Sequence, residues 1–164
     1  MPPVAAKRKT DIGAPHYQGL LPPIIQRNYG KWVRHEIPRP GVLVHTAESG
    51  ERLYSVRAGS PRLLSTKTIR LFAALADEFS GGFLRFTSRN NVEFLLADGT
   101  KVDPLILRLE SEGYPVGGTG PAITSIVHTQ GWIHCHSAAS DASGVVKSVM
   151  DELFQYFGSM VLPA

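Results

Sequence analysis

Cysteine is almost absent from this chain, which has a single one, Cys135, among 164 residues. One cysteine excludes the internal disulfide framework that small secreted proteins use. No apolar run reaches the ~20 residues that a membrane-spanning helix needs. The first residues carry a basic patch with no apolar segment after it, which is not the pattern of a secretory signal. These absences predict a cytoplasmic protein without membrane insertion.

Charge is also sparse. Charged residues make up 19% of the chain and hydrophobic residues 43%, with a net charge of +3. This balance is typical of a globular protein rather than a disordered one. The small positive excess favours an anionic ligand or an acidic partner, but it is too weak to predict nucleic-acid binding. The length allows one domain, or one domain and part of another.

The most informative stretch is LRFTSRNN, residues 84–91. Its alternation predicts a strand with one apolar face, while the other face carries Arg85, Thr87 and Arg89. Two arginines this close repel each other unless something negative lies between them. A guanidinium group can bind both oxygens of a carboxylate or oxyanion at once. The row is therefore either an anion cradle or an exposed strand face that keeps the sheet soluble.

The neighbouring segments predict an α+β fold. Residues 42–58 contain two strands joined by a turn, and Ser65 is placed to cap a following helix. Residues 92–97 predict a further strand, and an amphipathic helix follows with Pro104 in its first turn. Two successive βαβ-like units indicate a ferredoxin-like sandwich, which we assign to residues 42–116.

Residues 1–41 contain many prolines and glycines, so we expect an irregular N-terminal arm. The arm also carries more large apolar side chains than a linker needs. It therefore packs either on a partner or back on its own core. These apolar residues are Tyr17, Leu20, Leu21, Ile24, Ile25, Tyr29, Trp32 and Ile37.

Glycine, serine, threonine and histidine become frequent from residue 117 onward. The run GGTG, residues 117–120, could bring backbone close to a ligand, although such runs are usually only turns. Residues 128–136 hold three histidines and Cys135, but the spacing matches no common zinc pattern, so a zinc site is the less favoured interpretation.

A last helix is predicted after this stretch, capped by Asp141 or Ser143. The apolar residues 161–164 predict an interrupted domain.

Long motifs carry a resemblance to a known family: LPPIIQRNYGKW (21–32), HEIPRPGVLVH (35–45), VRAGSPRLLS (56–65), LRFTSRNNVEF (84–94), GGTG (117–120) and VHTQGWIHCHSAASDASG (127–144). From about Asp11 onward, the chain resembles the N-terminal part of the β subunits of dissimilatory sulfite reductases. The resemblance implies a ferredoxin-like half-domain, followed in residues 117–164 by the start of a sirohaem and iron–sulfur domain.

The resemblance also implies an oxidoreductase that interconverts sulfite and sulfide by six electrons, in the reductive or the reverse direction. The enzyme would work as an α₂β₂ complex with an electron-transfer partner. In this family the two-arginine strand faces sirohaem, a macrocycle ringed with carboxylates, beside a [4Fe–4S] cluster. The implied sirohaem contacts are Arg57, Arg85, Thr87, Arg89, Asn91, Gly118 and Thr119, and the implied cluster ligand is Cys135.

A [4Fe–4S] cluster takes four thiolates, and this chain has one cysteine. We therefore expect a partial sequence, with the other cluster cysteines beyond residue 164. Two alternatives remain open. One is a sirohaem nitrite reductase or an assimilatory sulfite reductase. The other is a non-catalytic ferredoxin-like subunit that binds a partner, which the single cysteine and the apolar arm favour.

Overall fold

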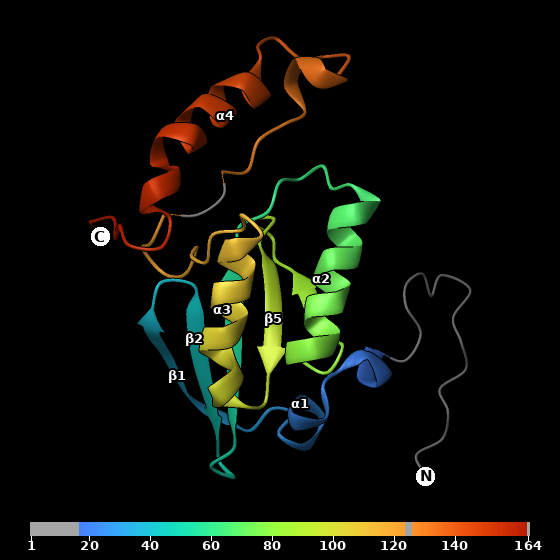
Figure 1. Ribbon diagram of the computed structural model, residues 1–164, viewed down its shortest axis with the longest axis vertical. Coiled ribbons are helices and arrows are strands. Elements are labelled where there is room, and N and C mark those ends of the chain that lie inside the picture. Colours follow the sequence, from blue (N-terminus) through green and yellow to red (C-terminus); the bar gives the residue numbers. More distant parts are fainter. Residues whose placement is uncertain (1–16, 124–125, 164) are drawn as a thin grey trace.

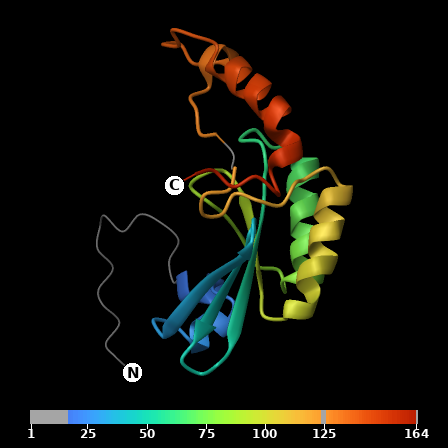
Figure 2. The ribbon, with the colours of Figure 1, turned by 90° about the vertical axis from the view of Figure 1, so that its left-hand side faces the viewer.

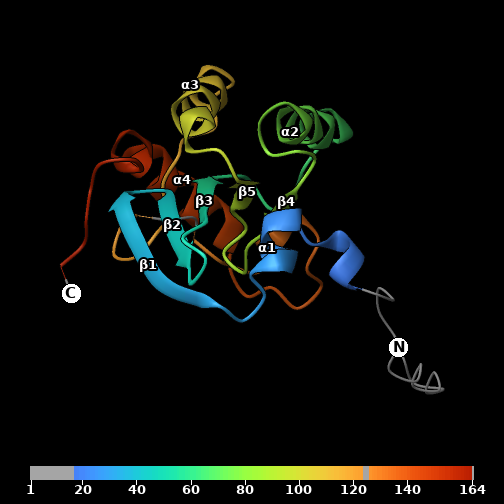
Figure 3. The same cartoon turned by 90° about the horizontal axis from the view of Figure 1, so that it is seen from below.

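A five-stranded antiparallel sheet organises the chain, with the strand order β1-β2-β3-β5-β4. The computed structural model describes residues 17–123 and 126–163. Helices α2 and α3 cover one face of the sheet, and the short helix α1 lies on the opposite side (Figures 1 and 3). The strands are β1 (Trp32–Arg39), β2 (Val42–Ala47), β3 (Arg52–Ala58), β4 (Leu84–Phe86) and β5 (Val92–Leu96), and the helices are α1 (Pro23–Arg27), α2 (Thr66–Phe79), α3 (Val102–Ser111) and α4 (Ala142–Leu153).

The topology confirms the predicted ferredoxin-like α+β class. Strands β3 and β4 both pair antiparallel with β5, which lies between them, so β3 and β4 run parallel to each other. Helix α2 connects β3 to β4. This split βαβ arrangement is typical of ferredoxin-like folds.

The core lies between the sheet and helices α2 and α3. Val56 and Phe94 point to the helices by strand alternation, and Phe72 and Leu105 meet them at helical spacing. Each is fully buried, which stabilises the fold by about 1.5–3 kcal/mol per large apolar side chain. Because alternate strand residues point to opposite faces, the other side of β3 and β5 carries the polar residues described below.

Side-chain caps set the predicted helix starts. The Ser65 hydroxyl accepts a hydrogen bond from the amide of Thr68, which confirms it as the cap of α2. The Asp141 carboxylate accepts from the amide of Gly144 at 3.0 Å, so Asp141 rather than Ser143 caps α4. The Ser143 hydroxyl donates instead to the carbonyl of Gln130 at 2.7 Å.

Part of the N-terminal arm is regular, so the expectation of irregular structure is wrong for helix α1 and for residues 32–39. Residues 32–39 form the edge strand β1, with Glu36 opposite Val44 of β2. Pro38 misled the sequence argument, because an edge strand tolerates a proline that a central strand would not. Residues 1–16 of the arm lie outside the described residues, so any contact expected of them is not described.

The segment before β1 folds back on its own chain. Ile24 of α1 is buried, and so is Asn28 just after it. The side-chain amide of Asn28 donates from Nδ2 to the carbonyl of Ile24 at 2.9 Å and to the carboxylate of Glu51 at 2.6 Å. Leu20, by contrast, stays largely exposed. The arm therefore divides into a part bound to the β2–β3 hairpin and a part with exposed apolar side chains.

The C-terminal segment extends away from the sheet, as the red helix α4 in Figures 1 and 2 shows. No residue of α4 is buried. Phe157 attaches the segment, because its ring is 1% exposed and packs against Gly59 and Gly117. Val161 adds a bridge to Ala122. Among the described residues, no helix is both long enough and apolar enough to cross a membrane.

Candidate anion-binding site

The predicted arginine strand is shorter than its sequence pattern suggested. Strand β4 ends at Phe86, and the chain then turns, with the Thr87 amide donating to Asn91 at 2.8 Å. Asn90 has φ 62°, a left-handed backbone that asparagine tolerates, and the chain bends there. Arg85 therefore lies on the strand while Arg89 lies on the turn, so strict alternation does not extend to Arg89.

A buried carboxylate occupies the place between the arginines. Glu93 of β5 lies opposite Arg57 of β3 on one side and opposite Arg85 of β4 on the other. Its side chain is only 1% exposed. Arg57 Nε donates to Glu93 Oε1 at 2.8 Å, Arg85 Nε donates to Oε2, and the Ser55 hydroxyl also donates to Oε1. The negative group that the arginine row required is thus supplied by the chain itself.

Glu93 is held in its charged form by these donors. Burial by itself raises the pKa of the Glu93 carboxyl. Hydrogen bonds from Arg85, Ser55 and Arg57, together with the positive charge of Arg85, outweigh that effect and leave the pKa below its usual range. The carboxylate is therefore ionised at neutral pH.

The two guanidinium groups keep capacity for a second anion. Each reaches Glu93 through Nε, and no other carboxylate in the described residues pairs with either. Arg57 is 18% exposed, and Arg85 is 61% exposed. Two positive charges against one negative charge leave the cluster of Arg57, Arg85 and Glu93 with a net positive charge. Such a cluster suits an anionic group brought from outside.

The GGTG loop lies directly beside Arg57. The amide of Gly117 donates to the Arg57 carbonyl at 3.0 Å, and the Arg57 amide donates to Gly41 at 2.8 Å. The Thr119 hydroxyl accepts from the Gly41 amide at 2.8 Å. Gly41 has φ +81°, and a Cβ there would lie 2.5 Å from the Gly117 nitrogen, so a larger residue is excluded. The close backbone approach expected of this loop is made to the chain itself.

The structure brings most of the predicted sirohaem contacts to one end of the sheet. Arg89 donates from Nη2 to the carbonyl of Gly118 at 3.4 Å, which joins the turn after β4 to the loop beside Arg57. Thr87 and Asn91 shape that turn, since the Thr87 hydroxyl accepts from the amide of the buried Asn91 at 3.1 Å. These two residues therefore position the arginines.

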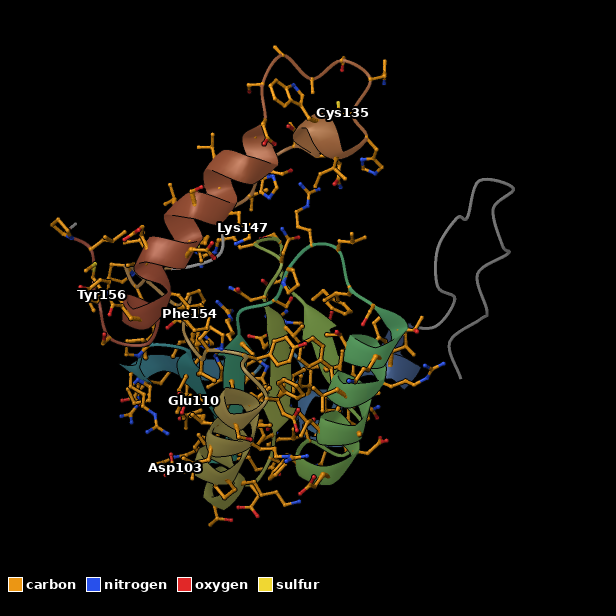
Figure 4. The ribbon with its side chains drawn as sticks, turned by 45° about the horizontal axis from the view of Figure 1, so that its top comes forward. Asp103, Glu110, Cys135, Lys147, Phe154 and Tyr156 are labelled. Atoms are coloured by element: carbon orange, nitrogen blue, oxygen red, sulfur yellow. The ribbon has the colours of Figure 1, made fainter. Side chains whose placement is uncertain are left out.

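Among the described residues, no hydrogen bond or ion pair joins Cys135 to the arginine cluster. Figure 4 shows Cys135 at the outer end of the C-terminal segment, away from the labelled Asp103 and Glu110 of α3. Its sulfur lies 3.6 Å from the Ser137 hydroxyl, and hydrogen bonds from the side chain and backbone of Ser137 lower the thiol pKa. Within the described residues, no group of three or more His, Cys, Asp or Glu side chains is placed to hold a metal ion. One thiolate also does not fit a whole [4Fe–4S] cluster.

A cleft of about 620 Å³ separates α4 from the loops at the end of the sheet. The basic residues Arg62 and Lys147 line it from opposite sides, together with Asn90 of the turn after β4. Phe157, which anchors the C-terminal segment, also lines the cleft. The cleft therefore adjoins the turn that carries Arg89.

Sequence reasoning missed the residues that organise the site. Glu93 was treated only as part of a strand, although a charged residue inside the apolar run VEFLL, residues 92–96, is a signal of a buried partner.

Another feature that the sequence did not reveal is a cross-strand histidine pair, in which the Nδ1 atoms of His35 and His45 lie 2.6 Å apart. Burial first, and the neighbouring His35 second, lower the pKa of His45.

Part of the chain matches a known protein family. Residues 45–112 match the family described as the nitrite/sulfite reductase ferredoxin-like half domain. The match agrees with the topology of the sheet, which is that of a ferredoxin-like half-domain.

Particular relatives are more specific. The chain is 53% identical, over 95% of its length, to the dissimilatory-type sulfite reductase subunit beta of Archaeoglobus fulgidus. It is 51% identical, over 97% of its length, to that of Nitratidesulfovibrio vulgaris. The predicted resemblance to these β subunits is confirmed. The chain spans 44% of the length of each of the two relatives.

A solved structure agrees on the fold. The crystal structure of dissimilatory sulfite reductase I matches with a TM-score of 0.70, at 12% identity, over 82% of this chain and 35% of that chain. At that identity the match shows a shared fold alone.

Proposed function

We propose that this chain is part of the β subunit of a dissimilatory sulfite reductase. The observation that carries the proposal is the 53% identity to one such subunit over 95% of the chain. The reaction adds six electrons to sulfite: SO₃²⁻ + 6 e⁻ + 7 H⁺ gives HS⁻ + 3 H₂O, and the reverse reaction oxidises sulfide. An electron-transfer partner supplies or accepts the electrons.

The arginine cluster fits a sirohaem periphery. Sirohaem carries carboxylates around its ring, and the guanidinium groups of Arg57 and Arg85 present donors beyond the Nε atoms that Glu93 occupies. Arg89 adds a third positive charge at the same end of the sheet. Thr87, Asn91, Gly118 and Thr119 hold the backbone that shapes this end. When bound, sirohaem supplies the redox centre at which sulfite is reduced.

The chain's own contribution is binding and orientation. Arginine side chains around the site neutralise the carboxylates of the macrocycle and favour an anionic substrate nearby. Cys135 would supply one thiolate of a [4Fe–4S] cluster, and the other ligands would come from outside these residues. The lowered thiol pKa favours the thiolate form that a metal binds.

We further propose that the partner is an α subunit in an α₂β₂ assembly. The division into residues 1–41, 42–116 and 117–164 accompanies that proposal as arm, half-domain and start of the sirohaem and iron–sulfur domain. Exposed apolar side chains of the arm and β1 support a contact there, among them Leu20, Tyr29 and Ile37. Such side chains are typical of surfaces that a partner covers.

The test is to express the full-length subunit that contains this chain together with its α subunit. We expect a purified complex with sirohaem absorbance and with sulfite-dependent oxidation of a reduced artificial electron donor. Nitrite serves as the comparison substrate, because the half-domain occurs in nitrite reductases as well. A complex that reduces nitrite but not sulfite, or that purifies without sirohaem, would contradict the proposal.

A further inference from the structure

We propose that Glu93 is the positioning residue of the anion-binding site, holding Arg57 and Arg85 by their Nε atoms so that the rest of each guanidinium group faces a carboxylate of the bound macrocycle. This inference rests on the proposed function, since it deepens the role of the same arginines. Glu93 itself is buried, so its role would be to hold the arginines rather than to touch the macrocycle.

The sheet register explains why one carboxylate can hold both arginines. Strand β5 lies between β3 and β4, and Glu93 is the direct cross-strand neighbour of Arg57 on one side and of Arg85 on the other. Its two oxygens are divided between them, with Oε1 accepting from Arg57 and Oε2 from Arg85. The spacing of the two guanidinium groups is therefore set by a single rigid strand.

A carboxylate is specifically required at this position. Glutamine keeps the length of the side chain, but its NH₂ group is a donor and would face one of the two guanidinium donors. One arginine would then lose its acceptor, and the two positive charges would repel each other without a negative charge between them. Ser55 and Arg57 both donate to Oε1, so the glutamine oxygen would take that position and its NH₂ group would face Arg85.

The arrangement is more than a structural ion pair. Both arginines bind Glu93 by the inner nitrogen of the guanidinium group, and no other carboxylate among the described residues pairs with the outer nitrogens. Glu51, by comparison, pairs with the outer Nη2 of Arg27 at 2.6 Å on an exposed surface of the hairpin. The pattern around Glu93 thus orients two cations and leaves their outer donors for another anion.

The experiment compares Glu93→Gln with the Arg57→Met/Arg85→Met double variant in the full-length αβ complex. The readouts are sirohaem bound per β subunit and the rate at which sirohaem is lost on dilution. We expect Glu93→Gln to accelerate loss at least tenfold, and to add less than twofold in the double-variant background. Glu51→Gln is the matched control, because it removes an arginine-paired carboxylate away from the site and should leave sirohaem unchanged.

Folding is controlled by a second variant. Glu93→Asp keeps the charge but shortens the side chain, so it cannot reach both arginines equally, and we expect sirohaem loss between that of the native complex and that of Glu93→Gln. If Glu93→Gln does not assemble, the same comparison is made with Glu93→Asp. Equal acceleration by the Glu93 variant with and without the arginines would overturn the positioning role.

Two further outcomes separate this inference from the proposed function. If the double arginine variant loses sirohaem while the Glu93 variants keep it, the arginines bind the macrocycle and Glu93 does not position them. If neither the arginine nor the Glu93 variants affect sirohaem, both the proposed contacts and the inference about Glu93 are wrong.

Discussion

Replacing Phe157 with alanine should release the C-terminal segment from the sheet while leaving the sheet folded. The Phe157 ring is 1% exposed and packs on Gly59 and Gly117. Removing a buried phenylalanine costs about 3–5 kcal/mol. The remaining attachments are few, such as the Leu162 amide donating to the Pro121 carbonyl at 2.8 Å. The lost packing therefore exceeds what these hydrogen bonds can hold.

Hydrogen exchange measured by mass spectrometry in the full-length complex tests this expectation. A loss of 3–5 kcal/mol corresponds to roughly 100-fold to several-thousand-fold faster exchange, since about 1.4 kcal/mol is tenfold. The acceleration should appear in residues 117–123 and 157–163, but not in β3 or β5. Phe154→Ala is the matched control, because Phe154 is three residues away and 52% exposed. Equal effects of the two variants, or unchanged exchange in Phe157→Ala, would refute the anchoring role.

Other predictions concern stability and the site. Ser65→Ala removes the cap of α2 and should lower the free energy of unfolding by about 1 kcal/mol in urea denaturation, whereas a loss below ~0.3 kcal/mol would contradict the capping role. Asn90→Ala should cost about 1 kcal/mol, because alanine at φ 62° is strained, and Asn90→Gly should not. The pKa of His45 is lowered in the folded state, so its contribution to stability is present above its unfolded pKa of about 6.5. That contribution is lost as the pH falls through the folded pKa. Urea denaturation midpoints should therefore fall on acidification in the native protein, and should fall less in His45→Gln. Cys135→Ser should lower iron per β subunit in the full complex and leave the half-domain folded, and unchanged iron would exclude Cys135 as a ligand.

The sequence was most informative where local chemistry decides the structure. The start of helix α2 followed from the Ser65 cap, which depends only on residues within a few positions. The bend at Asn90 also has a local cause, because asparagine tolerates a left-handed backbone. Patterns of this kind do not require knowledge of the distant chain.

The sequence was misleading where a distant partner decides the structure. Strand β4 ends at Phe86, where its pairing with β5 stops. The alternation of residues 84–89 could not show this end, because it depends on the partner strand. Strand β1 forms in a proline-containing stretch because β2 offers it an edge. Glu93 looked like an ordinary strand residue, and only the sheet order shows that it lies between Arg57 and Arg85. The charges of the site were visible in the sequence, but their mutual arrangement was not.

The crossing of Gly41 with the GGTG loop has a consequence for the order of folding. The Gly41 amide bonds the Thr119 hydroxyl across 78 residues of chain. Closing so long a loop is entropically unfavourable until the intervening contacts exist, and contacts of high sequence separation form slowly. Arg57 is bonded on both sides by this crossing, through Gly41 and Gly117. We therefore expect the candidate anion-binding end of the sheet to assemble after the β2–β3 hairpin and helix α3, so that a nascent chain has a folded hairpin before Arg57, Arg85 and Glu93 come together.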